Sequence, residues 1–260
     1  MPPRGLFGVR VDQAREPILN VPTVVVALLL VLGAVHAVRE LLLTTQADRD
    51  LILTFAFIPR RYDSTLVLGE LFPGGFGARV WTFVTYAFLH ADLSHLGINA
   101  IWLLAFGSPL ARRFGGWRFL ALSAVTVAAG ALIYLVAHAG EMAPMVGASA
   151  AVSGMMGAAT RFVFQPGGSL DMWHSGDHDP DRIPAAPLWL ALRNPRVIAF
   201  LAVWFGLNLL FGLGSLSITG SGQNVAWEAH VGGFLAGLLL FSVFDPVVRS
   251  PDAEDRATLH

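Results

Sequence analysis

The chain has 260 residues, of which 55% are hydrophobic and 13% are charged, and its mean hydropathy is +0.61. Soluble domains carry about a quarter charged residues, so this composition excludes an ordinary soluble protein and favours one membrane domain with several spans. The formal net charge of −1 indicates no nucleic-acid partner, and the lack of cysteine excludes disulfides, thiolate metal sites and a cysteine nucleophile.

Six segments are mostly apolar over about the 20 residues that a membrane-spanning helix needs. In chain order they are residues 18–38, 93–110, 117–137, 144–164, 196–213 and 225–243. The expected fold class is therefore all-α, a polytopic bundle of six transmembrane helices within residues 18–247. The first segment is too long for the apolar part of a signal peptide and has no small-residue cleavage site, so we expect it to be retained.

The connections differ in character. Residues 39–91 are too apolar for an exposed loop, so we expect short helices half-immersed at the outer interface. A seventh span is the rival interpretation, but the charged run at residues 60–63 interrupts it. The Gly-, Ser- and Thr-rich residues 214–223 could act as a mobile lid.

The connection at residues 165–195 holds several side chains of metal-binding type: His174, Asp177, His178, Asp179 and Asp181. A hard or borderline metal could be imagined there. The segment is rich in glycine and proline and lies opposite the site described below, so we favour a solvated linker and expect no metal. Residues 1–17 and 248–260 are expected to be terminal tails, and residues 250–260 have the composition of a disordered polar segment.

An even number of spans places both tails on one side of the membrane. Twelve of the seventeen arginines fall on that side, and the other five all lie within residues 39–91. The positive-inside rule then puts both termini in the cytoplasm. We expect an integral multi-pass protein of a bacterial inner membrane.

Three spans that begin on the outer side carry polar residues at a similar depth. Ser149 and His230 each lie about five residues into their segments, roughly 8 Å deep at 1.5 Å per residue. Asn99 lies at roughly 9 Å, with His95 one turn above it. All four fall in the outer third of a ~30 Å hydrocarbon core, as a shared site that opens outward requires.

These residue types are those of nucleophilic catalysis, because a serine hydroxyl needs a base to take its proton. We expect Ser149 to be the nucleophile and His230 the base. The helix that starts after Gly147 has free N–H groups for an oxyanion, and His95 and Asn99, which share a helix face, could complete that site. Glu228 lies about 200° around the helix from His230, so we expect a Ser–His dyad whose imidazole is held by packing.

Each residue also has a plainer interpretation. Ser149 could be a small packing residue, His230 an interhelical hydrogen-bonding group and Asn99 a tie between helices. Their shared depth favours a site. For Gly233 and Gly237 we favour packing, because a GxxxG face lets the sixth helix approach the fourth closely.

Two residues beside the site are expected to have supporting roles, and one further serine is an alternative nucleophile. Outside the second span, Asp92 is expected to cap the helix and His90 to hydrogen-bond within the outer loop. Ser153 is a possible nucleophile, but it lies a turn deeper than Ser149, away from the helix start.

Three motifs together resemble the rhomboid intramembrane proteases. They are His95-Leu-Gly-Ile-Asn99, Gly147-Ala148-Ser149-Ala150 and the run from Ala229-His230 to Gly237. Their order and spacing agree with the family over about residues 80–244. The resemblance implies that Ser149 is the nucleophile and His230 the general base. It also implies that His95, Asn99 and the Ser149 N–H form the oxyanion hole. The implied partners are the lipid bilayer and transmembrane segments of other proteins, cut near their outer ends, with no cofactor.

The sequence departs from the family pattern at three positions. Ala150 replaces a usual glycine but is small enough to keep the helix start open. Thr82 follows Trp81 where arginine is common, which puts the anchoring of the long connection in doubt. Ser153 replaces an aromatic residue that packs on the base, so His230 is either looser or hydrogen-bonded to Ser153. The alternative function is therefore a catalytically inactive rhomboid-like protein that binds transmembrane clients. A transporter or channel is disfavoured, because the inner half of the bundle has almost no charge.

Overall fold

The computed structural model describes residues 21–63, 72–170, 179–212 and 225–247. Within these ranges the secondary structure is helical, apart from turns and one isolated β-bridge between Phe57 and Met145. The predicted tails, the predicted lid and three of the possible metal ligands (His174, Asp177 and His178) lie outside the described residues.

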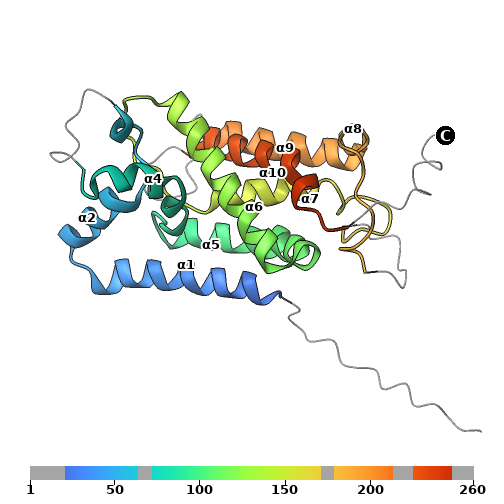
Figure 1. Cartoon of the computed structure of the whole chain (residues 1–260), viewed down its shortest axis with the longest axis horizontal. Coiled ribbons are helices and arrows are strands. Elements are labelled where there is room, and N and C mark those ends of the chain that lie inside the picture. The colour runs from blue at the N-terminus through green and yellow to red at the C-terminus, as the bar shows by residue number, and fades with distance from the viewer. Residues whose placement is uncertain (1–20, 64–71, 171–178, 213–224, 248–260) are drawn as a thin grey trace, which may run out of the picture.

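The described helices include four stretches that are long and apolar enough to cross a bilayer. In chain order the elements are α1 (Thr23–Leu42), α2 (Thr45–Phe55), η1 (Pro59–Tyr62), α4 (Gly75–Thr85), η2 (Tyr86–Phe88), α5 (Leu93–Trp102), η3 (Leu103–Gly107), α6 (Ser108–Ala137), α7 (Ser149–Ala159), α8 (Leu188–Ala191), α9 (Pro195–Gly212) and α10 (Trp227–Phe244). The four stretches are α1, the run Leu93–Ala137, α9 and α10. Figure 1 shows that α1 begins and α10 ends at the same end of the bundle.

The second and third predicted spans form the single helical run Leu93–Ala137, which is broken at one glycine. Gly115 has φ 73°, a left-handed conformation that glycine adopts without the steric cost of a side chain. The chain turns back there (Figure 1), so the two arms of the run point in opposite directions.

The first span continues beyond its predicted end at residue 38. Arg39 is buried, and its guanidinium pairs with Asp48 of α2 at 2.7 Å and donates to the His90 carbonyl at 2.6 Å. Because these partners satisfy the charge, the helix does not have to end at Arg39, and it runs on to Leu42.

The fourth predicted span, residues 144–164, is wrong in its extent, because the α-helix covers only Ser149–Ala159. The preceding residues are extended instead. Phe57 and Met145 exchange two backbone hydrogen bonds of 3.1 and 2.8 Å, and Gly147 donates to the Tyr86 carbonyl at 3.0 Å. Ser149 is therefore the first residue of its helix and not about the fifth.

Helix α7 lies at the centre of the bundle, and all of its residues but Ser149 are buried. A Cβ at Gly233 would overlap the α7 backbone at Ala150, and one at Gly237 would overlap it at Gly154. The prediction that a GxxxG face brings these two helices together is confirmed. This close approach sets the start of α10 against the start of α7.

The predicted short helices within residues 39–91 are present as α2 and α4. Thr82, which stands where arginine is common in the family it resembles, is fully buried, and its hydroxyl lies 2.9 Å from that of Tyr62. The Trp81 indole donates to the Thr54 carbonyl at 3.2 Å. Neutral hydrogen bonds therefore tie α4 to the earlier part of this connection, at the position where arginine is common in the family.

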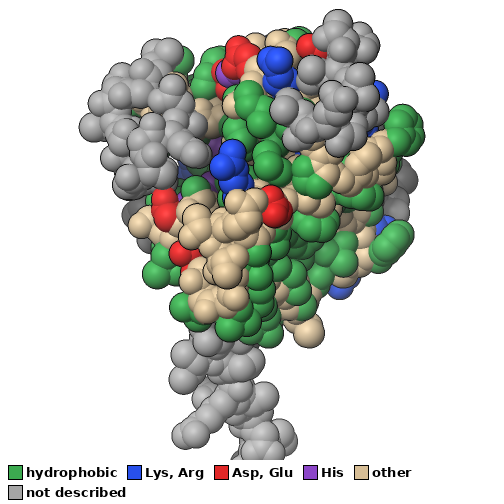
Figure 2. All heavy atoms as spheres, turned by 90° about the vertical axis from the view of Figure 1, so that its left-hand side faces the viewer, with side chains coloured by type: hydrophobic (Ala, Val, Ile, Leu, Met, Phe, Trp, Pro, Cys, Tyr) green, Lys and Arg blue, Asp and Glu red, His purple; other side chains and the backbone are tan. Residues whose placement is uncertain are grey.

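The two ends and the flanks of the bundle have different surfaces. Figure 2 looks onto the end that carries α2 and α4, where charged side chains of both signs lie among hydrophobic ones. On the flanks, large apolar side chains face outward, such as Leu30 of α1 at 68% exposure and Val203 of α9 at 63%. Such flanks favour lipid as the surrounding medium.

At the opposite end, the interpretation of the 165–195 connection as a solvated linker is wrong for Asp181. Its side chain is buried and pairs with Arg112, and its carbonyl accepts from Arg113 at 2.9 Å. Arg113 also makes two hydrogen bonds of 2.8 Å to Asp245. The Arg112–Asp181 pair ties the connection to α6, and the Arg113–Asp245 pair ties α6 to the end of α10.

Candidate active site

Two polar side chains that are 81 residues apart in sequence meet near the starts of α7 and α10. The hydroxyl oxygen of Ser149 lies 2.8 Å from Nε2 of His230. Ser149 is the first residue of α7 and His230 the fourth of α10. The distance is that of a good hydrogen bond and is within the range needed for proton transfer from a nucleophile to a base.

The other nitrogen of the imidazole also has a partner, which sequence reasoning missed. His230 Nδ1 lies 2.6 Å from Oδ1 of Asn208 in α9. The expectation that packing alone holds the imidazole is therefore wrong. Glu228 does face elsewhere, as predicted, and lies 3.4 Å from Nε2 of His138. The signal in the sequence was the amide itself, because an amide in an apolar span needs a hydrogen-bonding partner, which is ordinarily on a neighbouring helix.

His95 lies against the segment that leads into α7. Gly147 has φ +122°, and a Cβ there would lie 2.7 Å from His95 Nε2 and 3.6 Å from Ser149 Oγ. The imidazole and the hydroxyl thus flank the same glycine. The first N–H groups of α7 begin beside them, and such groups have no partner within their own helix.

Asn99, one turn along α5 from His95, is buried. In the described part of the chain its amide donates one hydrogen bond, to the His95 carbonyl at 2.9 Å. The structure therefore brings Ser149, His230 and His95 together and links Asn99 to His95, not directly to Ser149.

The loop before α5 contacts both His95 and the segment that leads into α7. Asp92 caps α5 by accepting from the His95 N–H at 2.8 Å, as predicted. His90 is fully buried, stands edge-on to the His95 ring at 5.1 Å, and its Nε2 accepts from the Ala148 N–H at 3.4 Å. The pKa of His90 is lowered to about 3. Burial is the main cause, and the nearby His95, His36 and Arg39 lower it further. A neutral imidazole can accept from this backbone N–H, so the His90 ring bonds to the loop before α7 and not, as expected, within the outer loop.

The residues at the two remaining departures are accommodated. Ala150 is buried, and its methyl group faces Gly130, where a Cβ would come within 2.7 Å of it. Ser153 is also buried, but the partners of the His230 imidazole are Ser149 and Asn208. Aromatic packing near the base comes from α9, where the Trp204 ring lies 4.6 Å from that of Phe234, one turn beyond His230.

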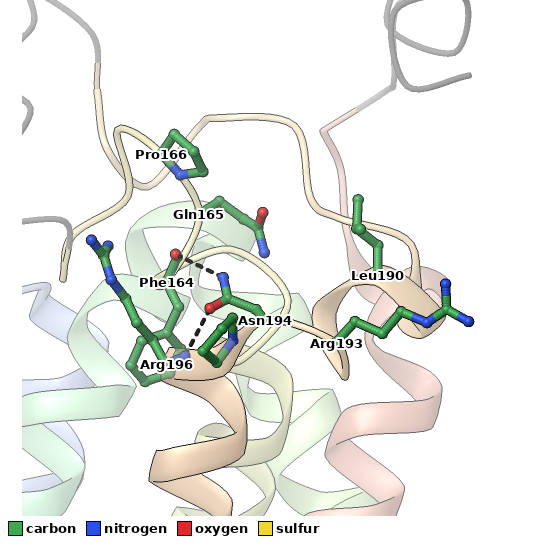
Figure 3. A pocket seen from close by; sticks show the side chains of 8 residues that line it. Phe164, Gln165, Pro166, Leu190, Arg193, Asn194 and Arg196 are labelled. Carbon is green, nitrogen blue, oxygen red and sulfur yellow. Dashed lines mark hydrogen bonds between the residues drawn. The ribbon is translucent and has the colours of Figure 1, made fainter. Parts of the chain in front are cut away.

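A separate cavity of about 480 Å³ lies at the base of α9, at the end that carries α8 (Figure 3). Its lining residues are Phe164, Gln165, Pro166, Leu190, Arg193, Asn194, Pro195 and Arg196. Asn194 bridges two segments there, donating to the Phe164 carbonyl and accepting from the Arg196 N–H. This lining has no serine, histidine or carboxylate, so the cavity is distinct from the Ser149 site. Among the described residues, no cluster of three or more histidine, cysteine or acidic side chains is arranged to hold a metal ion.

Comparison with known proteins gives a consistent assignment. The family model of the Rhomboid domain matches residues 77–245, a range that contains Ser149, His230, His95 and Asn99. RHOMBOID-like protein 12, mitochondrial, of Arabidopsis thaliana is 30% identical over 171 residues, which cover 60% of this chain and 44% of that protein. Rhomboid protease GlpG of Serratia proteamaculans is 27% identical over 163 residues, which cover 62% of this chain and 47% of that protein.

A human relative, Rhomboid-related protein 3, is 38% identical over 81 residues, which cover 31% of this chain and 20% of that protein. The chain thus spans about half or less of the length of these curated relatives. With its apolar helices it is an integral membrane protein. Because the family model covers more than half of its residues, the chain belongs to the rhomboid family.

Proposed function

We propose that this protein is an intramembrane serine endopeptidase that uses a Ser–His pair to cleave transmembrane segments of other membrane proteins near their outer ends. The observation that carries the proposal is the 2.8 Å contact between Ser149 Oγ and His230 Nε2 inside an apolar bundle. Polar groups are costly at membrane depth and are retained there mainly for function. Relatives from Serratia and Yersinia that bear the name rhomboid protease support the same activity.

The proposed topology has six crossings with both termini in the cytoplasm. The turn at Gly115 supports two crossings within the run Leu93–Ala137, and α7 would be a short central crossing surrounded by protein. Helices α1 and α10 have their chain-terminal ends at the same end of the bundle, as an even number of crossings requires. Reporter fusions at both termini test the orientation, and fractionation tests the expected bacterial inner membrane.

The chemistry starts with Ser149. His230 Nε2 takes the hydroxyl proton as Oγ attacks the carbonyl carbon of the scissile peptide bond, giving a tetrahedral oxyanion. Collapse of this intermediate breaks the C–N bond, and the imidazolium gives its proton to the leaving amine. The carboxyl side of the substrate bond remains on Ser149 as an ester. Water then attacks the ester with His230 again as the base, which releases the acid and restores the hydroxyl.

The oxyanion needs donors that already point at it. The Ser149 N–H at the start of α7 is one, because the first N–H groups of a helix have no partner within it. His95 supplies a second through Nε2, which lies beside Gly147. Asn99 has two amide hydrogens, and only one is needed for its bond to the His95 carbonyl. The second is proposed to reach the oxyanion when substrate is bound.

The substrate must be locally unwound, because a peptide bond inside a helix is shielded by the surrounding turns. Entry from the lipid between helices brings the segment to Ser149, which lies at the start of α7. Ser149 is also only two residues from Gly147, which has a positive φ. Ser149 therefore lies at the start of its helix, with no preceding helical turn over it.

A serine-directed fluorophosphonate probe tests the proposal on the purified full chain in detergent. We expect the wild type to be labelled and to cleave a fluorescent transmembrane substrate, and both activities to be lost in Ser149→Ala. The matched control is Ser153→Ala, one turn deeper on the same helix, which should keep both. Equal labelling of wild type and Ser149→Ala would refute the nucleophile assignment. A wild type that binds the substrate but neither labels nor cleaves it would establish the alternative of an inactive client-binding protein.

A further inference from the structure

We infer that Asn208 is a positioning residue that fixes the tautomer of His230. The proposed site is then a hydrogen-bonded series of serine, histidine and asparagine from α7, α10 and α9. The inference rests on the proposed peptidase function and extends it. Its basis is the second hydrogen bond of the imidazole, from Nδ1 to Asn208 Oδ1 at 2.6 Å.

The orientation of the Asn208 amide follows from its other contact. Its Nδ2 lies 2.8 Å from the carbonyl oxygen of Trp204, one turn earlier on α9. A carbonyl oxygen can only accept, so the NH2 group of the amide must face Trp204. The oxygen of the amide is then the atom that faces His230.

The amide orientation in turn fixes the protonation of the imidazole. Oδ1 can only accept, so His230 Nδ1 must carry the hydrogen in their 2.6 Å contact. A neutral imidazole has one N–H, which leaves the lone pair on Nε2. That lone pair faces Ser149 Oγ at 2.8 Å, ready to receive the hydroxyl proton. The chain of contacts from Trp204 to Ser149 therefore selects the one neutral tautomer in which His230 can act as a base.

An amide suits this position better than a carboxylate. A buried ionised carboxylate must be paired or pay a large desolvation cost, whereas an amide carries no net charge into an apolar bundle. The nearest acid on the same helix as the base, Glu228, lies against His138 and leaves the imidazole to Asn208. A neutral acceptor offers less charge stabilisation to an imidazolium than a carboxylate, so its main effect is on orientation and tautomer.

Asn208 also explains how the base stays fixed although Ser153 replaces the aromatic residue on α7. Helix α9 is peripheral, and among its described side chains only those of Val197 and Trp204 are buried. The Trp204–Phe234 ring contact and the Asn208–His230 hydrogen bond join α9 to α10 on consecutive turns. The polar support of the base thus comes from α9, and the Trp204–Phe234 contact holds α9 against α10 one turn away.

The test compares Asn208→Leu, which removes the acceptor at similar size, with Asn208→Asp, which keeps an acceptor oxygen. The control is Leu209→Ala, a half-exposed position on the same helix. We expect Asn208→Leu to lower kcat and the rate of fluorophosphonate labelling about 10- to 100-fold, the range found when the residue that orients a metal-ligating histidine is removed. KM and the midpoint of thermal unfolding should stay near those of the wild type. Asn208→Asp should recover most of the rate, and Leu209→Ala should match the wild type.

A second readout does not depend on activity. In protein labelled with 15N-histidine, the His230 nitrogens are assigned by their absence in His230→Ala. We expect the proton on Nδ1 in the wild type and a mixture of tautomers in Asn208→Leu. If the wild type carries the proton on Nε2, or if Asn208→Leu keeps both the tautomer and the labelling rate, the inference is wrong. A wild type with the expected tautomer but no labelling would leave the Asn208 assignment standing and reject the peptidase function.

Discussion

Gly147→Ala should separate the geometry of the oxyanion region from the stability of the fold. Gly147 has φ +122°, and an added Cβ would lie 2.7 Å from both Nε2 and Cε1 of the His95 ring. The backbone strain costs about 1–3 kcal/mol, and the imidazole must also move. If the shift removes one oxyanion donor, kcat falls about 10²- to 10³-fold. The free energy of unfolding should fall by only about 1–3 kcal/mol.

A matched control exists at Gly140, which has φ +79° and no atom within 4 Å of an added Cβ. Gly140→Ala should lower the free energy of unfolding by a similar strain cost and leave kcat near that of the wild type. Cleavage of a fluorescent transmembrane substrate gives kcat, and unfolding in mixed micelles gives stability. If Gly147→Ala and Gly140→Ala have the same kcat, then His95 does not serve the reaction from its position beside Gly147.

Two further predictions concern the support around the site. The pKa of His90 is lowered to about 3, so the unfolded chain takes up a proton below about pH 6.5 while the folded chain does not. The contribution of the neutral His90 to the free energy of unfolding is therefore present above about pH 6.5 and is lost as the pH falls towards about 3. Between about pH 7.5 and 5.5 the wild type should lose about 1.4 kcal/mol more than His90→Gln, measured by unfolding in micelles. Equal losses of unfolding free energy in the two proteins would contradict the titration of His90 as the cause. Gly237→Val, whose Cβ would overlap Gly154, should cost about 1–3 kcal/mol and lower probe labelling by moving α10 off α7. Gly206→Val, in open space on α9, should do neither, and equal effects in the two variants would contradict the role of close packing.

Local composition predicts the helices of this fold well and their interruptions less well. Apolar runs bounded by charge located the long stretches, and Arg112 and Arg113 signalled the end of an arm close to the turn at Gly115. The extended stretch before Ser149 was missed, because its mostly apolar residues are compatible with a membrane span. What holds it extended is pairing with Phe57 and Tyr86, which lie far away in sequence. The first span was likewise predicted to end before Arg39, because the partner that satisfies its charge, Asp48, belongs to the next helix.

Within the site, residues whose role follows from their chemical type could be predicted from the sequence. Residues whose role depends on the direction in which a helix presents them could not. A serine and a histidine at similar depth in an apolar chain are distinctive by type, so Ser149 and His230 could be paired before their contact was known. Asn208 differs, because an amide in a span is ordinarily a tie between helices, and only the rotation of α9 turns its oxygen towards the imidazole. Hydrophobic periodicity fixes such a rotation poorly where a helix is apolar on all sides. The orienting partner of a base in a membrane enzyme is therefore harder to predict from sequence than the base itself, and any polar residue at matching depth on a neighbouring helix is a candidate for that role.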